Sequence, residues 1–199
     1  PPQVKTLKAA VVDRREAMQL LMGYNSFNGY VWNKLFDLQL IRENDIRFHA
    51  DYPACEDTMF VGSYLYHCSR VCVTEECLYC YRQVSGGANR GRYSGRKAYD
   101  PKWMSVFEMT EYMADLYKDD AVTAACRLHE VREAGIVLRS MEAADYHGAD
   151  HARLKGILRR GAGLFFRDEN SGRSQKLSVL LSCISPKLEL AVWKLRNRK

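Results

Sequence analysis

The chain has 199 residues and a formal net charge of +6, with 47% hydrophobic and 11% aromatic residues. This composition is typical of a folded globular protein and excludes a disordered chain. No apolar run approaches the ~20 residues that span a bilayer, and the first residues contain no signal-peptide core. We therefore expect a soluble, cytoplasmic protein.

Helices and irregular segments alternate in the first part of the chain. Asp13 is placed to cap a short helix over residues 14–24, because an aspartate can accept hydrogen bonds from the free N–H groups of a first turn. Apolar residues at helical spacing predict two further helices, over residues 32–44 and 56–70. The segment between these helices contains Pro53 and is expected to be extended and irregular.

Two short strands are expected next, over residues 71–74 and 78–82. In the second, Leu78 and Cys80 alternate with two tyrosines, which is the two-residue period of a strand. Strands that lack neighbours expose their edges and apolar faces. We therefore expect the chain to associate with itself or with another chain.

The rest of the chain is predicted to be helical. A glycine-rich basic segment at residues 83–97 is expected to be a flexible loop. Asp100 followed by Pro101 is typical of a helix start, and Pro186 is expected to interrupt the last helix. The helices predicted here cover residues 101–116, 119–138, 141–160 and 174–199.

Positive charge gathers in two stretches of this helical part. Residues 152–173 contain six basic and two acidic side chains, and residues 187–199 contain five and one. Such surfaces suit phosphates, anionic lipid head groups or nucleic acid. Because leucines and Trp193 stand among the basic residues of 187–199, this helix could lie on an anionic membrane, the alternative being packing against the preceding helices.

Neither the cysteines nor the histidines predict a metal site. The seven cysteines are odd in number, and their spacings do not match a zinc ribbon, so we expect free thiols in a reducing cytoplasm. His147 and His151 are four residues apart and could share a helix face. Two ligands are only half of a metal site, and no metal ligand is assigned in this chain.

Four short strings carry the strongest functional signal: WNKLF at residues 32–36, LIRENDIRF at 40–48, CEDTMF at 55–60 and LYCYR at 78–82. In order and spacing they resemble the second half of the catalytic domain of bacterial family-two glycosyltransferases, which have the GT-A fold. The resemblance implies an α/β fold class in which a partial GT-A-like domain, a few short strands with helices, precedes a mainly α-helical subdomain. The implied domains are an acceptor-side half over residues 1–95 and a helical C-terminal subdomain over residues 96–199.

The resemblance also implies a reaction. Family members transfer a sugar with inversion from a nucleotide-sugar donor to a glycan acceptor of the bacterial cell surface, with a magnesium or manganese ion in the complete enzyme. The Asp-x-Asp motif that binds this ion and the donor does not occur in the chain. We therefore expect a fragment of the enzyme that lacks the donor-binding half. This fragment is expected to be inactive alone and to hold no metal ion. It is expected to act in the cytoplasm or at the inner face of the cell membrane.

The resemblance assigns roles to named residues. Asp57 is the expected catalytic base, and Glu56 is its acidic neighbour. The residues expected to bind substrate are Trp32, Asn33, Lys34, Tyr81 and Arg82.

Each role has a structural alternative. Acidic residues are favoured in a first helical turn whether or not they catalyse. Trp32 could be a core anchor and Lys34 a solvated charge, and Arg82 could make a salt bridge. The alternative function is a basic helical module that binds nucleic acid or an anionic membrane without catalysis. It predicts salt-sensitive binding that does not depend on Asp57, whereas the glycosyltransferase interpretation includes no nucleic-acid partner.

Overall fold

The computed structural model describes residues 9–23, 27–74, 76, 78–82 and 99–197. Within these residues the chain is mainly helical, and its sheet consists of two antiparallel strands of three residues each. These are β1 (Ala10–Val12) and β2 (Val71–Val73), with Val11 opposite Cys72. The predicted α/β class with a partial GT-A-like domain is therefore wrong: this is a helical protein. The physical reason is that apolar residues of both halves of the chain bury against helices, while the two strands pair with each other.

The helices in the first part of the chain, within the described residues, are α1 (Arg14–Met22), α2 (Leu38–Glu43) and α3 (Glu56–Tyr66). Side-chain caps begin two of them, α1 and α2. Asp13 accepts a hydrogen bond from the backbone N–H of Glu16, and the Glu16 carboxylate accepts one from the N–H of Asp13. This reciprocal pair confirms the predicted cap of α1.

The predicted helix over residues 32–44 is wrong in its first half. The Asp37 side chain accepts a hydrogen bond from the backbone N–H of Gln39 at 2.8 Å, so the helix begins at Leu38. Before it, the backbone N–H of Lys34 donates to the carbonyl of Val31 in a turn. The predicted strand at residues 78–82 is also wrong, because its tyrosines stack on another part of the chain and form no ladder.

The helical remainder is confirmed, with shifted ends. It comprises a 3₁₀ turn η1 (Pro101–Met104) and the helices α4 (Ser105–Tyr117), α5 (Asp120–Ala143), α6 (Ala149–Arg167), α7 (Arg173–Ile184) and α8 (Pro186–Arg196). Pro186 interrupts the last helix as expected, since it lacks the N–H that would continue α7. The third predicted helix begins later, at Ala149, because Asp145 adopts a φ of 54° and ends the preceding helix in a turn.

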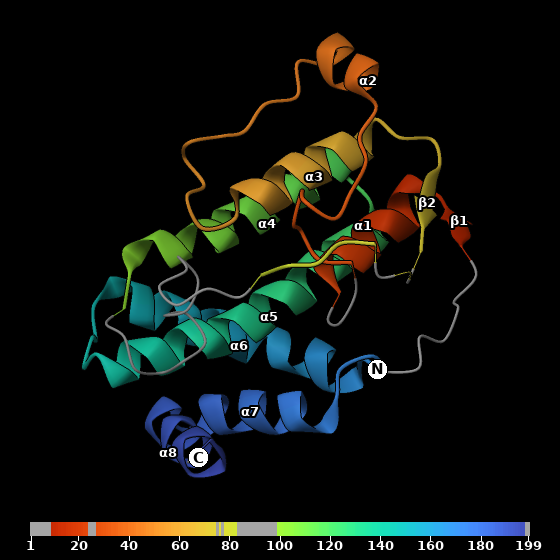
Figure 1. Ribbon diagram of the computed structural model, residues 1–199. Helices are drawn as coiled ribbons and strands as arrows, with labels where there is room; N and C mark the ends of the chain where they lie inside the picture. The colour runs from red at the N-terminus through yellow and green to blue at the C-terminus, as the bar shows by residue number, and fades with distance from the viewer. Residues whose placement is uncertain (1–8, 24–26, 75, 77, 83–98, 198–199) are drawn as a thin grey trace.

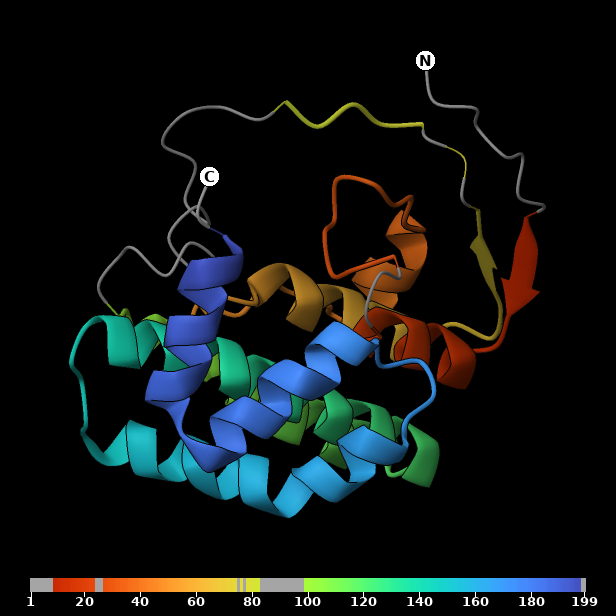
Figure 2. The same cartoon turned by 90° about the horizontal axis from the view of Figure 1, so that it is seen from below.

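The long helix α5 is the centre of the molecule. It packs against α1, α4, α6, α7 and α8 (Figure 1). The helices α7 and α8 cover one side of α5 and α6, facing the viewer in Figure 2, and α3 lies on the other side. The body of the protein is thus a bundle layered around a single helix.

Two apolar clusters form the core. One is rich in methionine and includes Met59 of α3 and Met113 of α4, so it joins residues from both of the predicted domains. The other surrounds Phe107, Leu154 and Phe165. The predicted domain boundary at residues 95 and 96 lies outside the described residues, as does the predicted glycine-rich loop. In the described part of the chain, no helix is both long and apolar enough to cross a bilayer.

Candidate functional site

The loop before α2 folds back onto the first turn of α3. It reverses direction at Asn28, which has a φ of 53°, and at Gly29. A Cβ on Gly29 would overlap Oγ1 of Thr58, so a larger residue could not sit here without displacing the loop. The close approach places residues 27–34 against the helical turn that contains Asp57.

The ammonium group of Lys34 makes hydrogen bonds to the backbone of this loop. Its Nζ donates to the backbone carbonyls of Phe27, Asn28 and Tyr30 at 3.1, 2.7 and 2.7 Å, and to Oδ1 of Asn33 at 2.9 Å. It also lies 5.0 Å from the centroid of the Phe27 ring. The three N–H donors of the ammonium group are shared among these four acceptors and hold the carbonyls of the turn together.

The pKa of Lys34 depends on its burial and on the charge of Asp57. Burial lowers the pKa of Lys34 from 10.5 to about 8, and the carboxylate of Asp57 partly opposes this by raising it. Asp57 is half-buried in the first turn of α3, whereas Glu56 is exposed. Cys55, at the N-cap of α3, makes no capping hydrogen bond through its side chain, so acidic residues compensate the helix dipole there. Lys34 and Asp57, two residues predicted for the site, thus lie close enough for the charge of Asp57 to affect the pKa of Lys34.

An open group of stacked rings lies on the outer side of the same loop. The ring of Trp32 stacks on Tyr30, Tyr79 and Tyr81, with centroid distances of 5.0, 4.7 and 4.9 Å. The three tyrosines are 41%, 53% and 55% exposed. We call these four residues the aromatic shelf. Trp32 is therefore part of a surface stack and belongs to neither core cluster.

A second aromatic contact fixes α2 and the loop after it to α3. Phe36 meets Phe60 and Tyr64 edge to face at 5.4 and 4.9 Å, and Phe48 stacks on Phe60 at 4.4 Å. The Tyr64 hydroxyl accepts a hydrogen bond from the backbone N–H of Asp37 at 2.8 Å. All four strings identified in the sequence therefore meet around α3 and the loop that covers its start.

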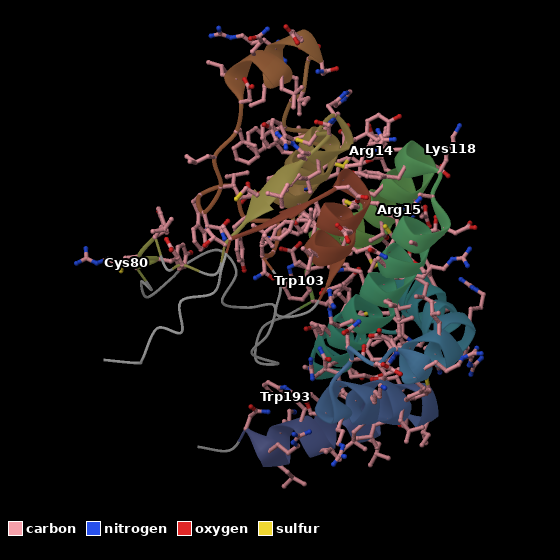
Figure 3. The ribbon with its side chains drawn as sticks, turned by 90° about the vertical axis from the view of Figure 1, so that its right-hand side faces the viewer. Arg14, Arg15, Cys80, Trp103, Lys118 and Trp193 are labelled. Atoms are coloured by element: carbon pink, nitrogen blue, oxygen red, sulfur yellow. The ribbon has the colours of Figure 1, made fainter. Side chains whose placement is uncertain are left out.

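The remaining predicted residues lie at the edge of this arrangement. Asn33 is exposed and donates to the carbonyl of Phe27 at 3.4 Å. Arg82 is exposed on the segment that carries Cys80 away from the helices (Figure 3). Sequence reasoning missed Tyr30, Tyr79 and Gly29. The Asn-Gly pair at residues 28 and 29, which is typical of tight turns, could have indicated the loop reversal.

The surroundings of Asp57 do not fit the divalent ion of the family. In the described part of the chain, the cluster of metal-binding side chains includes neither Asp57 nor Glu56. The Lys34 ammonium beside Asp57 also opposes a bound cation. We therefore assign no metal to this site.

Models of protein families, curated proteins and solved structures were compared with the chain, and none of them matches it. The glycosyltransferase resemblance therefore remains a prediction that rests on the four strings.

Proposed function

We propose that this chain forms the acceptor-binding part of an inverting bacterial glycosyltransferase whose nucleotide-sugar donor binds to residues outside this sequence. The observation that supports the proposal is the convergence of the four strings. They follow one another between residues 32 and 82, and their aromatic and charged residues pack around one helix and its covering loop.

The aromatic shelf supplies a surface for a sugar acceptor. A sugar ring has apolar C–H faces that pack on flat aromatic rings, while its hydroxyl groups remain free for hydrogen bonds. The exposed tyrosine rings and the amide of Asn33 offer both kinds of contact. The proposed acceptor is therefore a glycan that lies across the shelf near the start of α3.

Asp57 is the proposed base. In an inverting transfer the acceptor hydroxyl oxygen attacks the anomeric carbon of the donor sugar as the bond to the nucleotide diphosphate breaks. The hydroxyl proton passes to a carboxylate, which we assign to Asp57. Asp57 lies in the first turn of a packed helix, and such positioning of a reacting group is a large part of catalysis.

Acceptor binding can be tested on the 199-residue chain itself. Bacterial oligosaccharides would be titrated into the wild type and each variant in a calorimeter, a readout that does not depend on the Trp32 ring. Binding should be lost in Trp32→Ala and Tyr81→Ala and retained in Leu35→Ala, a matched control at a fully exposed leucine. Glycan binding that survives both aromatic substitutions would contradict the proposed shelf.

Catalysis is tested in a longer protein that contains this chain and turns over a nucleotide sugar. Asp57→Asn should lower turnover on the order of a hundredfold or more, the scale expected when an acid-base group is lost. Glu56→Gln should cost less, because that side chain is exposed. If Asp57→Asn kept the turnover of the wild type at saturating acceptor, Asp57 would not be the base and would only stabilise the start of α3.

A second candidate function is attachment to an anionic membrane, and it places the protein at the inner face of the cell membrane. It is favoured by large apolar side chains on α7 and α8 that are 43–67% exposed. Basic residues accompany the apolar ones on α8, as is typical of helices that lie on anionic lipid. The exposed apolar residues are Leu177, Leu180, Ile184, Leu188 and Leu195.

Vesicle co-sedimentation tests this candidate. Removing α8 would uncover the core, because Glu189 and Leu190 are buried, so point substitutions are preferable. Ile184→Ser with Leu195→Ser should reduce binding to phosphatidylglycerol vesicles, and neutral vesicles should bind neither protein. If the two substitutions left vesicle binding unchanged but abolished self-association in sedimentation velocity, the surface would be a contact between chains.

A further inference from the structure

The turn between α5 and α6 gathers three side chains that are typical metal ligands. Glu142 comes from the end of α5, His147 from the turn and His151 from the first turn of α6. One ligand atom of each lies within 4.8 Å of the others. Nε2 of His151 is 2.8 Å from Oε1 of Glu142, and the two imidazole centroids are 5.1 Å apart.

The backbone of this turn fixes the arrangement. Asp145 has a φ of 54°, and the N–H of Tyr146 donates to the carbonyl of Met141, which closes the end of α5. Gly148 is then the N-cap of α6. The chain thus reverses within a few residues, so a residue of α5 faces a residue of α6.

One carboxylate oxygen in this group lacks a partner. The Glu142 side chain is 3% exposed, and its Oε2 is buried with no hydrogen-bond partner in the described part of the chain. A buried carboxylate oxygen without a partner is costly and rare in native structures. The same side chains line an open cavity of about 380 Å³, together with Lys155 and residues 184–187. A bound cation would give Oε2 of Glu142 the partner that it lacks among the described residues.

We propose that Glu142, His147 and His151 bind a divalent transition-metal ion, with zinc as the best-fitting ion. Two imidazoles and one carboxylate are a ligand set that zinc adopts, with a fourth position left to water. Magnesium and calcium prefer oxygen ligands throughout and fit this set poorly. Ligand atoms around a tetrahedral zinc ion are roughly 3.4 Å apart, so side-chain movements of about 1 Å would close the site.

The charges around the site set its strength. Oδ1 of Asp145 lies 3.1 Å from Nε2 of His147 and adds negative charge. Lys155 and Lys187 line the cavity and oppose a cation. Replacing one of these lysines should therefore tighten metal binding, whereas replacing a ligand should weaken it.

The test uses tag-free 199-residue protein from which metals have been removed by a chelator. Titration with zinc chloride in a calorimeter should show one ion per chain, and magnesium chloride should give no binding. Cobalt chloride should produce the visible absorption bands of a tetrahedral ion. His147→Ala should lower zinc affinity on the order of a hundredfold, and Lys155→Ala should raise it.

Controls keep the result interpretable. The His147 side chain is 43% exposed, so its removal should leave the circular dichroism spectrum unchanged. His67→Ala, at an exposed histidine after α3, should bind zinc like the wild type. Zinc affinity that is unchanged in His147→Ala, or a failure of the unmodified protein to bind zinc, would overturn the proposal.

Discussion

Replacing Trp32 by alanine should release the segment 78–82 without unfolding the protein. Trp32 stacks on Tyr79 and Tyr81 of that segment at 4.7 and 4.9 Å, and the segment forms no regular secondary structure. A stacked pair contributes about 0.5–1.5 kcal/mol, so the two pairs together stabilise the attached state by about 1–3 kcal/mol. Their loss should raise the detached population roughly 5- to 140-fold, since each 1.4 kcal/mol is a factor of ten.

Limited proteolysis with chymotrypsin measures this population, because cleavage follows the open state when opening and closing are fast. Mass spectrometry should show faster cleavage after Tyr79 and Tyr81 in Trp32→Ala. Trp32→Phe keeps an aromatic ring and should cleave more slowly, and Leu35→Ala should match the wild type. The melting temperature should not change, as Trp32 lies outside both core clusters. Equal cleavage rates in Trp32→Ala and the wild type would show that stacking does not hold this segment.

Two further predictions concern charges. In carbon-13 NMR the Lys34 side chain should titrate near pH 8. Its pKa should fall further in Asp57→Asn, because the Asp57 carboxylate raises the pKa in the wild type. A titration midpoint near 10.5 would contradict the burial of this amine. Since the folded pKa lies below 10.5, the unfolded chain binds more protons between pH 8 and 10.5, so the Lys34 contribution to the unfolding free energy increases with pH in that range. Arg139→Met should lower the unfolding free energy in urea by about 3–5 kcal/mol, because Glu189, 3% exposed and 2.9 Å from Arg139, would lose its cationic partner. Adding Glu189→Leu to Arg139→Met should recover most of this loss in unfolding free energy. If Arg139→Met alone cost less than about 1 kcal/mol, the ion pair between Arg139 and Glu189 would not stabilise the fold as proposed.

The starts of several helices could be predicted from local sequence. Asp13 and Ser185 cap helices through hydrogen bonds to residues three positions ahead, and Pro186 interrupts a helix through its missing N–H. Such interactions involve neighbours in the chain, so their geometry follows from the order of residues.

The fold class could not be obtained in this way. Whether Val71 or Tyr79 belongs to a sheet depends on a partner strand elsewhere in the chain, and residues 78–82 have an alternation that fits both a strand and a pair of stacked tyrosines. Packing against Trp32, more than forty residues away, selects the stack. The helix predicted to begin at Trp32 was wrong because Asp37 caps a later start.

In the candidate sites too, the sequence indicates individual residues, and the tertiary structure decides which of them meet. The sequence identified Trp32, Lys34 and Asp57 as chemically promising, but only the reversal at Asn28 and Gly29 places the loop on α3 and lets Lys34 interact with Asp57. For the proposed zinc ligands, the sequence offered two histidines four residues apart. The third ligand comes from α5, because the backbone turn at Asp145 ends that helix and sets Glu142 against α6. A spacing rule describes one helix face, whereas this group is made by two helices that meet.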